Sequence, residues 1–253
     1  MNKVLRVDEL NIEIYADRQQ MGSAAADKVA EKISALLAGK PMVNIIFAAA
    51  PSQNELLTAL SQKNLEWSRI NAFHMDEYVG LAQNAPQGFG NFLKQLLFDK
   101  VNFNAVHYIN GNATDLKKES ERYTALLKEF PTDIVCMGIG ENGHLAFNDP
   151  PVADFNDQEW VKVVELDHVC RQQQVNDGCF ANISDVPVQA LTLTIPTLMK
   201  GKYIYCVVPG KTKQEAVYNT IHQNIVEKYP STILRKHSNA ILFLDAVSAE
   251  LIK

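Results

Sequence analysis

The sequence lacks the features that mark membrane, secreted and metal-dependent proteins. Its longest wholly apolar run covers residues 45–51, far short of the roughly 20 apolar residues that a membrane helix needs. The opening segment, MNKVLRVDEL, has no apolar signal core, so we expect a cytoplasmic protein that does not bind a membrane. The six histidines show no HxH, HxxxH or HExxH spacing, and we therefore expect no metal site.

Cysteine and positive charge are also too scarce to define a function. Cys136, Cys170, Cys179 and Cys206 form no CxxC pair, and three of them lie in or beside apolar stretches, which indicates reduced core thiols. The net charge of −5 argues against a nucleic-acid groove. Neither a GxxxxGK[ST] loop nor a GxSxG turn occurs, so two common classes of phosphate-binding and hydrolytic site are not indicated. The partner that remains is a small molecule.

What the sequence does contain is an alternation of apolar strands and amphipathic helices. Its 253 residues, 47% of them hydrophobic and 21% charged, are typical of a globular protein, and no Pro/Gly/Ser-rich linker divides them. Uninterrupted apolar strands that alternate with helices predict a mostly parallel sheet with both faces covered. We therefore predict the α/β class, as a three-layer sandwich in which residues 1–253 form a single domain.

The expected elements follow from hydrophobic periodicity. Strands are expected at residues 10–15, 43–49, 71–75, 134–138, 161–166, 190–195, 203–208 and 241–244. Helices are expected at residues 19–37, 54–60, 90–98, 123–129 and 213–225. Unusual segments follow four of the strands, at residues 48–52, 75–77, 138–144 and 209–213. Because ligands of open α/β sheets bind beyond the carboxyl ends of the strands, these segments predict one enzyme site.

The segment 138–144, Gly-Ile-Gly-Glu-Asn-Gly-His, places three glycines after a buried strand. Such a loop could present backbone amides to an anion and direct His144 into the crevice. It could equally be a glycine-rich turn with a surface histidine. Asp149 follows His144 by five residues, and a turn there would let the carboxylate orient the imidazole.

Two adjacent carboxylates, Asp76 and Glu77, end another strand. Neighbouring residues of a strand point to opposite faces, so at most one of the two is expected to face the crevice. The alternative is a pair of solvated loop acids. His74, on the buried side of this boundary, is interpreted as a core histidine.

Three further segments have polar side chains suited to a ligand. Ser52 and Glu55 fit a helix capping box, and the same helix start could bind an anion through its free amides. Lys213, in the turn Pro-Gly-Lys-Thr-Lys at 209–213, suits a phosphate, although a solvated basic turn is the alternative. Arg171 lies in the long segment 167–185, which we expect to be irregular and to act as a lid or substrate contact.

Two motifs together carry a family resemblance. Met-Asp-Glu-Tyr-Val-Gly at 75–80 and Gly-Ile-Gly-Glu-Asn-Gly-His-Leu-Ala-Phe-Asn-Asp-Pro at 138–150 resemble the glucosamine-6-phosphate deaminase (isomerase) family. Relatives of that family include galactosamine-6-phosphate isomerases and 6-phosphogluconolactonases. The order of the later segments also fits, from Val-Pro at 186–187 through Gly-x-x-Lys at 210–213 to Ser-Thr-Ile-Leu-Arg-Lys-His at 231–237.

The resemblance implies a fold, a reaction and a set of residues. The fold is a modified Rossmann-like α/β domain, and the reaction needs no metal or organic cofactor. The substrate is a sugar phosphate, glucosamine 6-phosphate or galactosamine 6-phosphate. Ring opening and proton transfer between C2 and C1 yield a ketohexose 6-phosphate and ammonia. The implied residues are Asp76, His144, Asp149 and Asn142 for catalysis, and Ala49, Ala50, Ser52, Gly143, Arg171 and Lys213 for substrate and phosphate binding.

Departures from the family pattern leave alternatives open. Asn142 stands where the family has Asp, Asp149 stands where it usually has Glu, and the phosphate loop reads Ala-Ala-Ala-Pro at 48–51 without a threonine. A lactonase-like hydrolase that uses His144, or a sensor that binds sugar phosphates without turnover, are the two alternatives. The basic and hydroxyl pattern of the allosteric members is missing after residue 150, so we expect no such regulation. The sequence leaves the epimer preference and homo-oligomer formation open.

Overall fold

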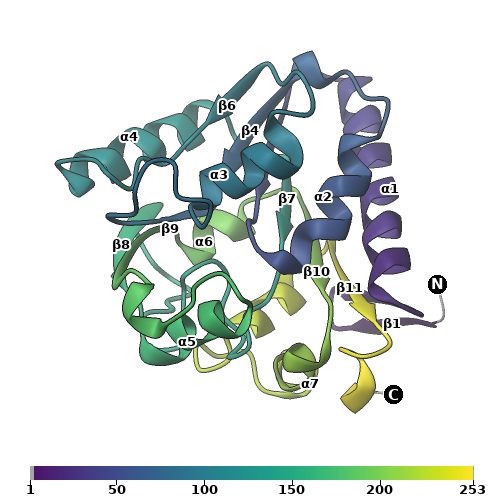
Figure 1. The fold of residues 1–253 in the computed structure, drawn as a ribbon. Helices are drawn as coiled ribbons and strands as arrows, with labels where there is room; N and C mark the ends of the chain where they lie inside the picture. The colour runs from purple at the N-terminus through teal and green to yellow at the C-terminus, as the bar shows by residue number, and fades with distance from the viewer. Residues whose placement is uncertain (1–2, 253) are drawn as a thin grey trace.

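The centre of the molecule is one large sheet. The computed structural model describes residues 3–252, and their main sheet has eight strands in the order β1-β2-β11-β10-β7-β3-β4-β6 (Figure 1). All neighbouring strands in it are parallel except β1 and β2, which confirms the mostly parallel sheet. The bounds are Lys3–Val7 (β1), Leu10–Tyr15 (β2), Val43–Phe47 (β3), Ile70–His74 (β4), Ala105–His107 (β6), Ile134–Met137 (β7), Tyr203–Val208 (β10) and Ala240–Asp245 (β11).

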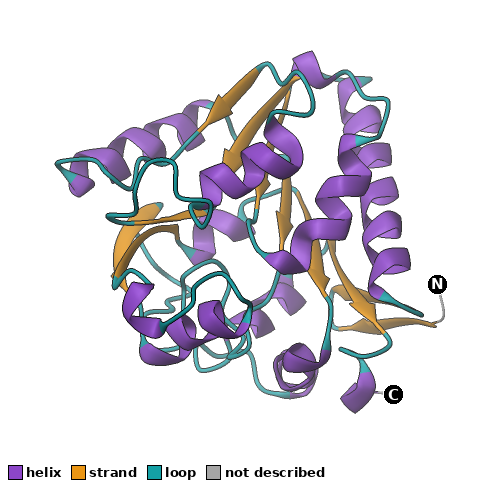
Figure 2. Cartoon of the chain, in the orientation of Figure 1, coloured by secondary structure: helices purple, strands orange, loops and turns teal. Residues whose placement is uncertain are grey.

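Helices cover both faces of this sheet, which makes the expected three layers (Figure 2). Successive strand residues enter two different cores: Ile45 and Phe47 belong to one, and Ile46 to the other. The first core includes buried side chains of α1 (Arg18–Leu37), α2 (Asn54–Ser61) and α3 (Phe89–Leu93). The second includes those of α4 (Leu116–Glu129), α6 (Ile195–Met199) and α7 (Gln214–His222). Because successive side chains of a strand point to opposite faces, each strand that is buried on both faces contributes to both cores.

Two expected strands do not belong to the main sheet. Residues Val161–Glu165 (β8) and Gln189–Leu193 (β9) form a separate antiparallel sheet with Asp76–Tyr78 (β5), in the order β5-β9-β8. Strand β8 is only partly covered, because Val161 and Val164 are buried whereas Val163 and Glu165 are exposed. Because β5 follows β4 after a single residue, this small sheet holds the acidic turn at the edge of the large one.

The segment 167–185 is more regular than expected. It forms helix α5 (His168–Asn176), whose N-cap Asp167 accepts a hydrogen bond from the Cys170 amide. A 3₁₀ turn, Ile183–Asp185, follows it. The prediction of an irregular segment was therefore wrong. The nine residues of α5 are rich in polar and poor in apolar side chains, yet they form a helix that packs against the rest of the molecule.

The prediction of a helix capping box at Ser52 and Glu55 was also wrong. A 3₁₀ turn, Pro51–Gln53, precedes α2, and no side chain caps either element. Glu55 instead forms an ion pair with Arg18 of α1, with Oε1 2.7 Å from the Nε atom. The helix expected at 213–225 also ends earlier, at His222. Among residues 3–252, no helix is long and apolar enough to cross a membrane.

Parallel pairing brings the functional segments to one edge. Phe47, near the end of β3, pairs with His74 of β4 and with Cys136 of β7, and Cys206 of β10 pairs with Met137. The segments that follow these strands therefore meet beyond their carboxyl ends. Further short 3₁₀ turns (Trp67–Arg69, Lys211–Lys213, Pro230–Lys236 and Glu250–Ile252) and a π-helical turn (Lys94–Phe98) complete the connections.

Candidate active site

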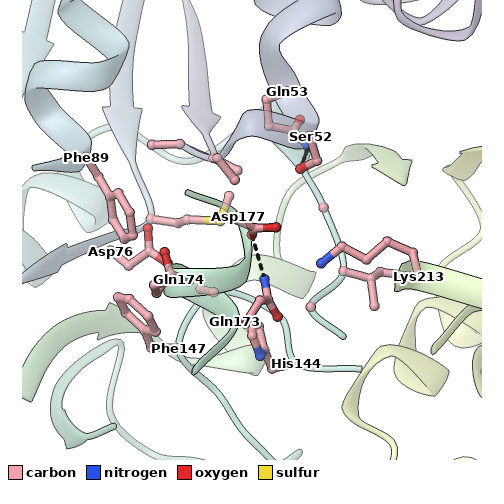
Figure 3. Close-up of a pocket in the computed structure, with 18 residues that line it drawn as sticks. Ser52, Gln53, Asp76, Phe89, His144, Phe147, Gln173, Gln174, Asp177 and Lys213 are labelled. Atoms are coloured by element: carbon pink, nitrogen blue, oxygen red, sulfur yellow. Dashed lines mark hydrogen bonds between the residues drawn. The ribbon is translucent and has the colours of Figure 1, made fainter. Parts of the chain in front are cut away.

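A cavity opens where the four segments meet. It encloses about 570 Å³, including the solvent at its mouth. Figure 3 shows Asp76 between two aromatic rings on one side and Lys213 on the opposite side, with His144 below them. The lining residues come from the four strand-end segments and the residues next to them, from α3, and from α5 with its C-cap: Ala48, Ala49, Ala50, Ser52, Gln53, Met75, Asp76, Phe89, Gly138, Ile139, Gly140, His144, Ala146, Phe147, Gln173, Gln174, Asp177 and Lys213.

Asp76 is a buried carboxylate without a partner. Its side chain is 7% exposed and makes no hydrogen bond or ion pair with any residue that the structure describes. Phe89 and Phe147, whose ring centroids are 5.5 Å apart, both line the cavity beside it. Burial, and then the charge of Glu77, raise the pKa of Asp76 well above its ordinary value. A carboxylate with a raised pKa in a cleft is suited to accept and return a proton near neutral pH.

Glu77 has a different role from Asp76, as the strand geometry predicts. Its Oε1 accepts hydrogen bonds from the amides of Tyr78 and Phe89, each at 3.0 Å, and its Oε2 accepts one from Gly90 at 2.9 Å. Burial raises the pKa of Glu77, while these three amides work in the opposite direction. Glu77 therefore holds the start of α3, so the reading of both acids as solvated loop residues is wrong.

His74 fixes the backbone at the acidic turn. Its Nε2 accepts a hydrogen bond from the Ile109 amide at 2.9 Å, so the ring proton lies on Nδ1, which donates to the Asp76 carbonyl at 2.8 Å. Burial lowers the pKa of His74 to about 4, and the ring is neutral near pH 7. His74 is thus the core histidine that the sequence indicated.

The glycines after β7 are required by close packing. A Cβ atom on Gly140 would lie 2.2 Å from the His144 ring, and one on Gly138 would lie 2.9 Å from Gln53 Nε2. Gly143 has φ +87°, which favours glycine. Ala146, which lines the cavity, has φ +49°, a conformation that alanine seldom adopts. The loop is therefore shaped around the His144 ring.

His144 is oriented by an amide and a carboxylate. Its Nδ1 lies 2.9 Å from Asp149 Oδ1 and 2.9 Å from Asn142 Oδ1. Asn142 Nδ2 donates to the same Asp149 Oδ1 at 2.8 Å, and Asn142 Oδ1 accepts from the His144 amide at 3.0 Å. Both partners occupy Nδ1, which leaves Nε2 for a ligand.

The charge state of Asp149 follows from its contacts. Burial by itself raises the pKa of this carboxyl, but the His144 charge, the hydrogen bonds from His144 and Asn142, and the nearby Cys170 thiol outweigh it. The pKa of Asp149 is therefore below its ordinary value, and the group is ionised near neutral pH. Asp76 and Asp149 thus have pKa values displaced in opposite directions, which is the usual sign of separate acid–base roles.

Three side chains of metal-ligating types meet behind the cavity. The ligand atoms of His144, Asp149 and Cys170 all lie within 4.8 Å of one another. Two ligands of one tetrahedral zinc, bound at about 2.0–2.1 Å, would lie roughly 3.3 Å apart. The 2.9 Å between His144 Nδ1 and Asp149 Oδ1 is instead a hydrogen-bond distance. The arrangement fits a hydrogen-bonded group better than a metal centre.

Lys213 is a buried cation with no partner in the described part of the chain. It is 6% exposed, and none of the hydrogen bonds or ion pairs of residues 3–252 involves its Nζ atom. Burial lowers its pKa, whereas Asp177 and Glu141 act in the opposite direction. Ser52 lies near the same end of the cavity in Figure 3. An unpaired buried ammonium group is suited to an anionic ligand group.

Helix α5 contributes glutamine side chains to the cavity lining, and its Arg171 does not line the cavity. Gln173, Gln174 and Asp177 line the cavity, and Gln173 Oε1 accepts a hydrogen bond from the Glu141 amide at 2.8 Å. Arg171 is not among the lining residues, because its guanidinium donates to the carbonyls of Ile183 at 2.7 Å and Val186 at 2.9 Å. The expected contact of Arg171 with a ligand therefore has no support from its placement.

The structure gathers most, but not all, of the residues expected in the site. Ala49, Ala50, Ser52, Asp76, His144 and Lys213 line one cavity. Asn142 and Asp149 lie behind His144, while Gly143 and Arg171 do not line the cavity. Gln173, Gln174 and Asp177 lie in the segment 167–185, which was expected to be a lid or substrate contact, although none of them was named as a site residue. Sequence reasoning missed Gln53, Phe89 and Phe147. Phe147 stood in the quoted motif at 138–150 without an assigned role, and Gln53 lies next to Ser52.

Comparisons with known proteins identify the family of this chain. Residues 16–243 match the family model described as glucosamine-6-phosphate isomerases/6-phosphogluconolactonase. The chain is 32% identical over 240 residues to the glucosamine-6-phosphate deaminase of Streptococcus suis, covering 95% of this chain and 98% of that protein. It is 36% identical over 188 residues to the glucosamine-6-phosphate deaminase of an Exiguobacterium species, covering 74% of this chain and 72% of that one.

Solved structures show the same fold. One described as a monomeric glucosamine-6-phosphate deaminase superposes with a TM-score of 0.86 at 30% identity, covering 95% of this chain and 99% of that chain. The 6-phosphogluconolactonase of Thermotoga maritima superposes with a TM-score of 0.76, at 19% identity and with 92% and 98% coverage. The second likeness shows the fold alone. From the match over residues 16–243 and the identity to whole relatives, the chain belongs to the glucosamine-6-phosphate isomerase/6-phosphogluconolactonase family.

Proposed function

We propose that this protein is an amino-sugar-6-phosphate deaminase and aldose–ketose isomerase. The observation that carries the proposal is the placement of one unpaired carboxylate, one oriented imidazole and one unpaired ammonium group around a single cavity. The similarity to deaminases over nearly the whole chain supports the same reaction. The substrate would be glucosamine 6-phosphate or galactosamine 6-phosphate, and the products a ketohexose 6-phosphate and ammonia.

The phosphate of the substrate would bind at the end of the cavity that holds Lys213. Its ammonium group supplies charge-assisted hydrogen bonds. Ser52, and the loop that carries Ala49 and Ala50, form the wall next to it. This loop precedes the 3₁₀ turn at Pro51–Gln53, which no side chain caps, so backbone amides remain there for the phosphate oxygens. Phosphate binding in this position would direct the sugar ring toward Asp76 and His144.

Two proton transfers isomerise the sugar, and a water molecule then hydrolyses the resulting C2 imine, which releases ammonia and leaves the C2 ketone. His144, with Nδ1 held by Asp149 and Asn142, would move a proton at the ring oxygen through Nε2 and open the pyranose. Asp76 would then take the proton from C2 and deliver it to C1. Its raised pKa suits this task, because a weakly acidic carboxyl binds the transferred proton better than a solvated one does. Neither step requires a metal or an organic cofactor.

The same proposal includes the domain organisation, the cellular location and the oligomeric state of the protein. We propose a single catalytic domain over residues 1–253 and a cytoplasmic location, which the four free cysteines support. A solved relative of 30% identity is described as monomeric. The site would therefore be complete in one chain, whether or not copies associate into a homo-oligomer.

Ammonia release is the direct test. The purified protein would be incubated separately with glucosamine 6-phosphate, galactosamine 6-phosphate and 6-phosphogluconolactone, with Asp76→Asn as the matched inactive control. The expected result is ammonia and ketohexose 6-phosphate from one of the amino sugars, abolished in the control. Lactone hydrolysis without ammonia would replace the proposal by a hydrolase. Tight binding of the amino-sugar phosphate with neither reaction would make the protein a sensor.

A further inference from the structure

The Asp149 carboxylate uses only one of its two oxygens for the contacts around His144. Oδ1 contacts His144 and Asn142, whereas Oδ2 is buried and has no hydrogen-bond partner within residues 3–252. The residue as a whole is 2% exposed, so solvent does not readily supply the missing donor. A buried charged oxygen without a donor is unfavourable. One acceptor therefore remains to be satisfied directly behind the imidazole ring.

The Cys170 thiol lies close to the Asp149 carboxylate. It is fully buried, and its Sγ atom is within 4.8 Å of the ligating atoms of both Asp149 and His144. The Cys170 amide donates to the N-cap Asp167 at 2.7 Å, which fixes the residue in the first turn of α5. Burial, and then the Asp149 charge, raise the pKa of Cys170, so the group stays a protonated thiol that can donate.

We propose that Cys170 is a positioning residue for the His144–Asp149 pair, because its S–H group donates to Asp149 Oδ2 and couples helix α5 to the loop after β7. Gln173 makes a second tie between the same two segments through the Glu141 amide. With both oxygens bound, the carboxylate stays ionised and turned toward His144 Nδ1. The lowered pKa of Asp149, to which the thiol contributes, agrees with this arrangement.

A kinetic test compares three cysteine variants and rests on the proposed deaminase activity. Cys170→Ala removes the donor, Cys170→Ser keeps one, and Cys206→Ala removes a buried thiol of β10 that does not line the cavity. We expect Cys170→Ala to lower kcat on the order of 10-fold with KM changed less than about twofold. Cys170→Ser should recover most of the loss, and Cys206→Ala should match the parent enzyme.

The split between kcat and KM separates positioning from packing. Gln173 and Gln174 of the same helix and its C-cap Asp177 line the cavity, so a displaced α5 would raise KM. A rise in KM without a fall in kcat would overturn the proposal. A fall in kcat that serine does not recover would also overturn it, because only the bulk of the side chain would then matter.

An infrared measurement tests the hydrogen bond without any activity. The S–H stretch absorbs where other protein groups do not, and the difference between the parent and Cys170→Ala isolates the Cys170 band. We expect the band of a hydrogen-bonded thiol, which shifts toward that of a free thiol in Asp149→Asn. A band unchanged in Asp149→Asn would overturn the inference even in a fully active enzyme. If the protein released no ammonia, the proposed function would fail while this measurement still decided the role of Cys170.

Discussion

Buried charges at the two ends of the central strands have opposite surroundings. Before the strands, Asp133 is fully buried and accepts hydrogen bonds from Lys40, Lys202 and the Asn44 amide at 2.5, 3.1 and 2.9 Å. Beyond the strands, Asp76 and Lys213 are nearly as buried, yet neither has a partner among the described residues.

The difference shows which charges serve the fold and which remain free for a ligand. Burial of an unpaired ion is costly, and a sequence under no other demand would pair or replace it. Asp133 ties the starts of β3, β7 and β10 together, because its partners Lys40, Asn44 and Lys202 precede or begin those strands. At the opposite end, the unpaired Lys213 is matched to the phosphate of the proposed substrate. The unpaired Asp76 is matched to its acidic C–H bond.

The largest effect is expected from Asp76→Asn. The amide cannot accept the C2 proton, so turnover should fall on the order of 10²-fold or more, while substrate binding changes little. The measurement is kcat and KM for ammonia release. Turnover near that of the parent would remove Asp76 from the mechanism, and the contrast between the two ends of the sheet would lose its functional meaning.

The same variant should be more stable than the parent at neutral pH. An acid whose folded pKa lies above its unfolded value destabilises the folded state at pH values above the unfolded one, and this effect disappears below it. Burial raises the pKa of Asp76 above its usual 3.8. The gain in unfolding free energy should therefore be present near pH 7 and absent below about pH 3.8. Urea titrations at the two pH values would measure it.

The second prediction compares a free lysine with a paired one. Lys213→Ala removes the proposed phosphate contact, which is worth roughly 1.5–3 kcal/mol for a hydrogen bond to a charged group. KM for the phosphorylated amino sugar should rise about 10–100-fold, at about 1.4 kcal/mol per tenfold change. Lys202→Ala is the matched control and should leave KM unchanged. An equal effect of Lys213→Ala on the unphosphorylated amino sugar would contradict a phosphate contact.

The sequence predicted the general fold and the location of the site well, because both depend on local patterns. Apolar strands that alternate with helices give a parallel sheet, and parallel strands place the segments after residues 47, 74, 137 and 208 at one edge. His144 and Asp149 were also expected to meet, since only a short turn separates them. Loop chemistry within a few residues can be interpreted without knowledge of distant contacts.

Contacts between distant segments could not be predicted in the same way. Strands β8 and β9 have ordinary strand patterns, and only their pairing with β5 removes them from the main sheet. The Arg171 guanidinium binds carbonyls 12 and 15 residues away, and no local sequence pattern predicts these contacts. The sequence shows that Asn142 stands where the family has Asp, but not that its amide would give Asp149 a hydrogen bond, which a carboxylate could not donate.

The smallest effect is expected at the paired end of the sheet. Asp133→Asn replaces one carboxylate oxygen by an NH₂ group, which then faces a lysine ammonium group or the Asn44 amide as a second donor. Because the lysine side chains are 30% and 58% exposed, their pairing contributes little, and the buried Asn44 amide dominates. We expect a loss of about 1–2 kcal/mol in unfolding free energy, with kcat and KM unchanged. Lys202→Met should lose less than about 0.5 kcal/mol, as expected for an exposed ion pair. If Asp133→Asn lowered kcat severalfold in a stably folded protein, charges at the start of the strands would also act on the site, and the division between the two ends would be wrong.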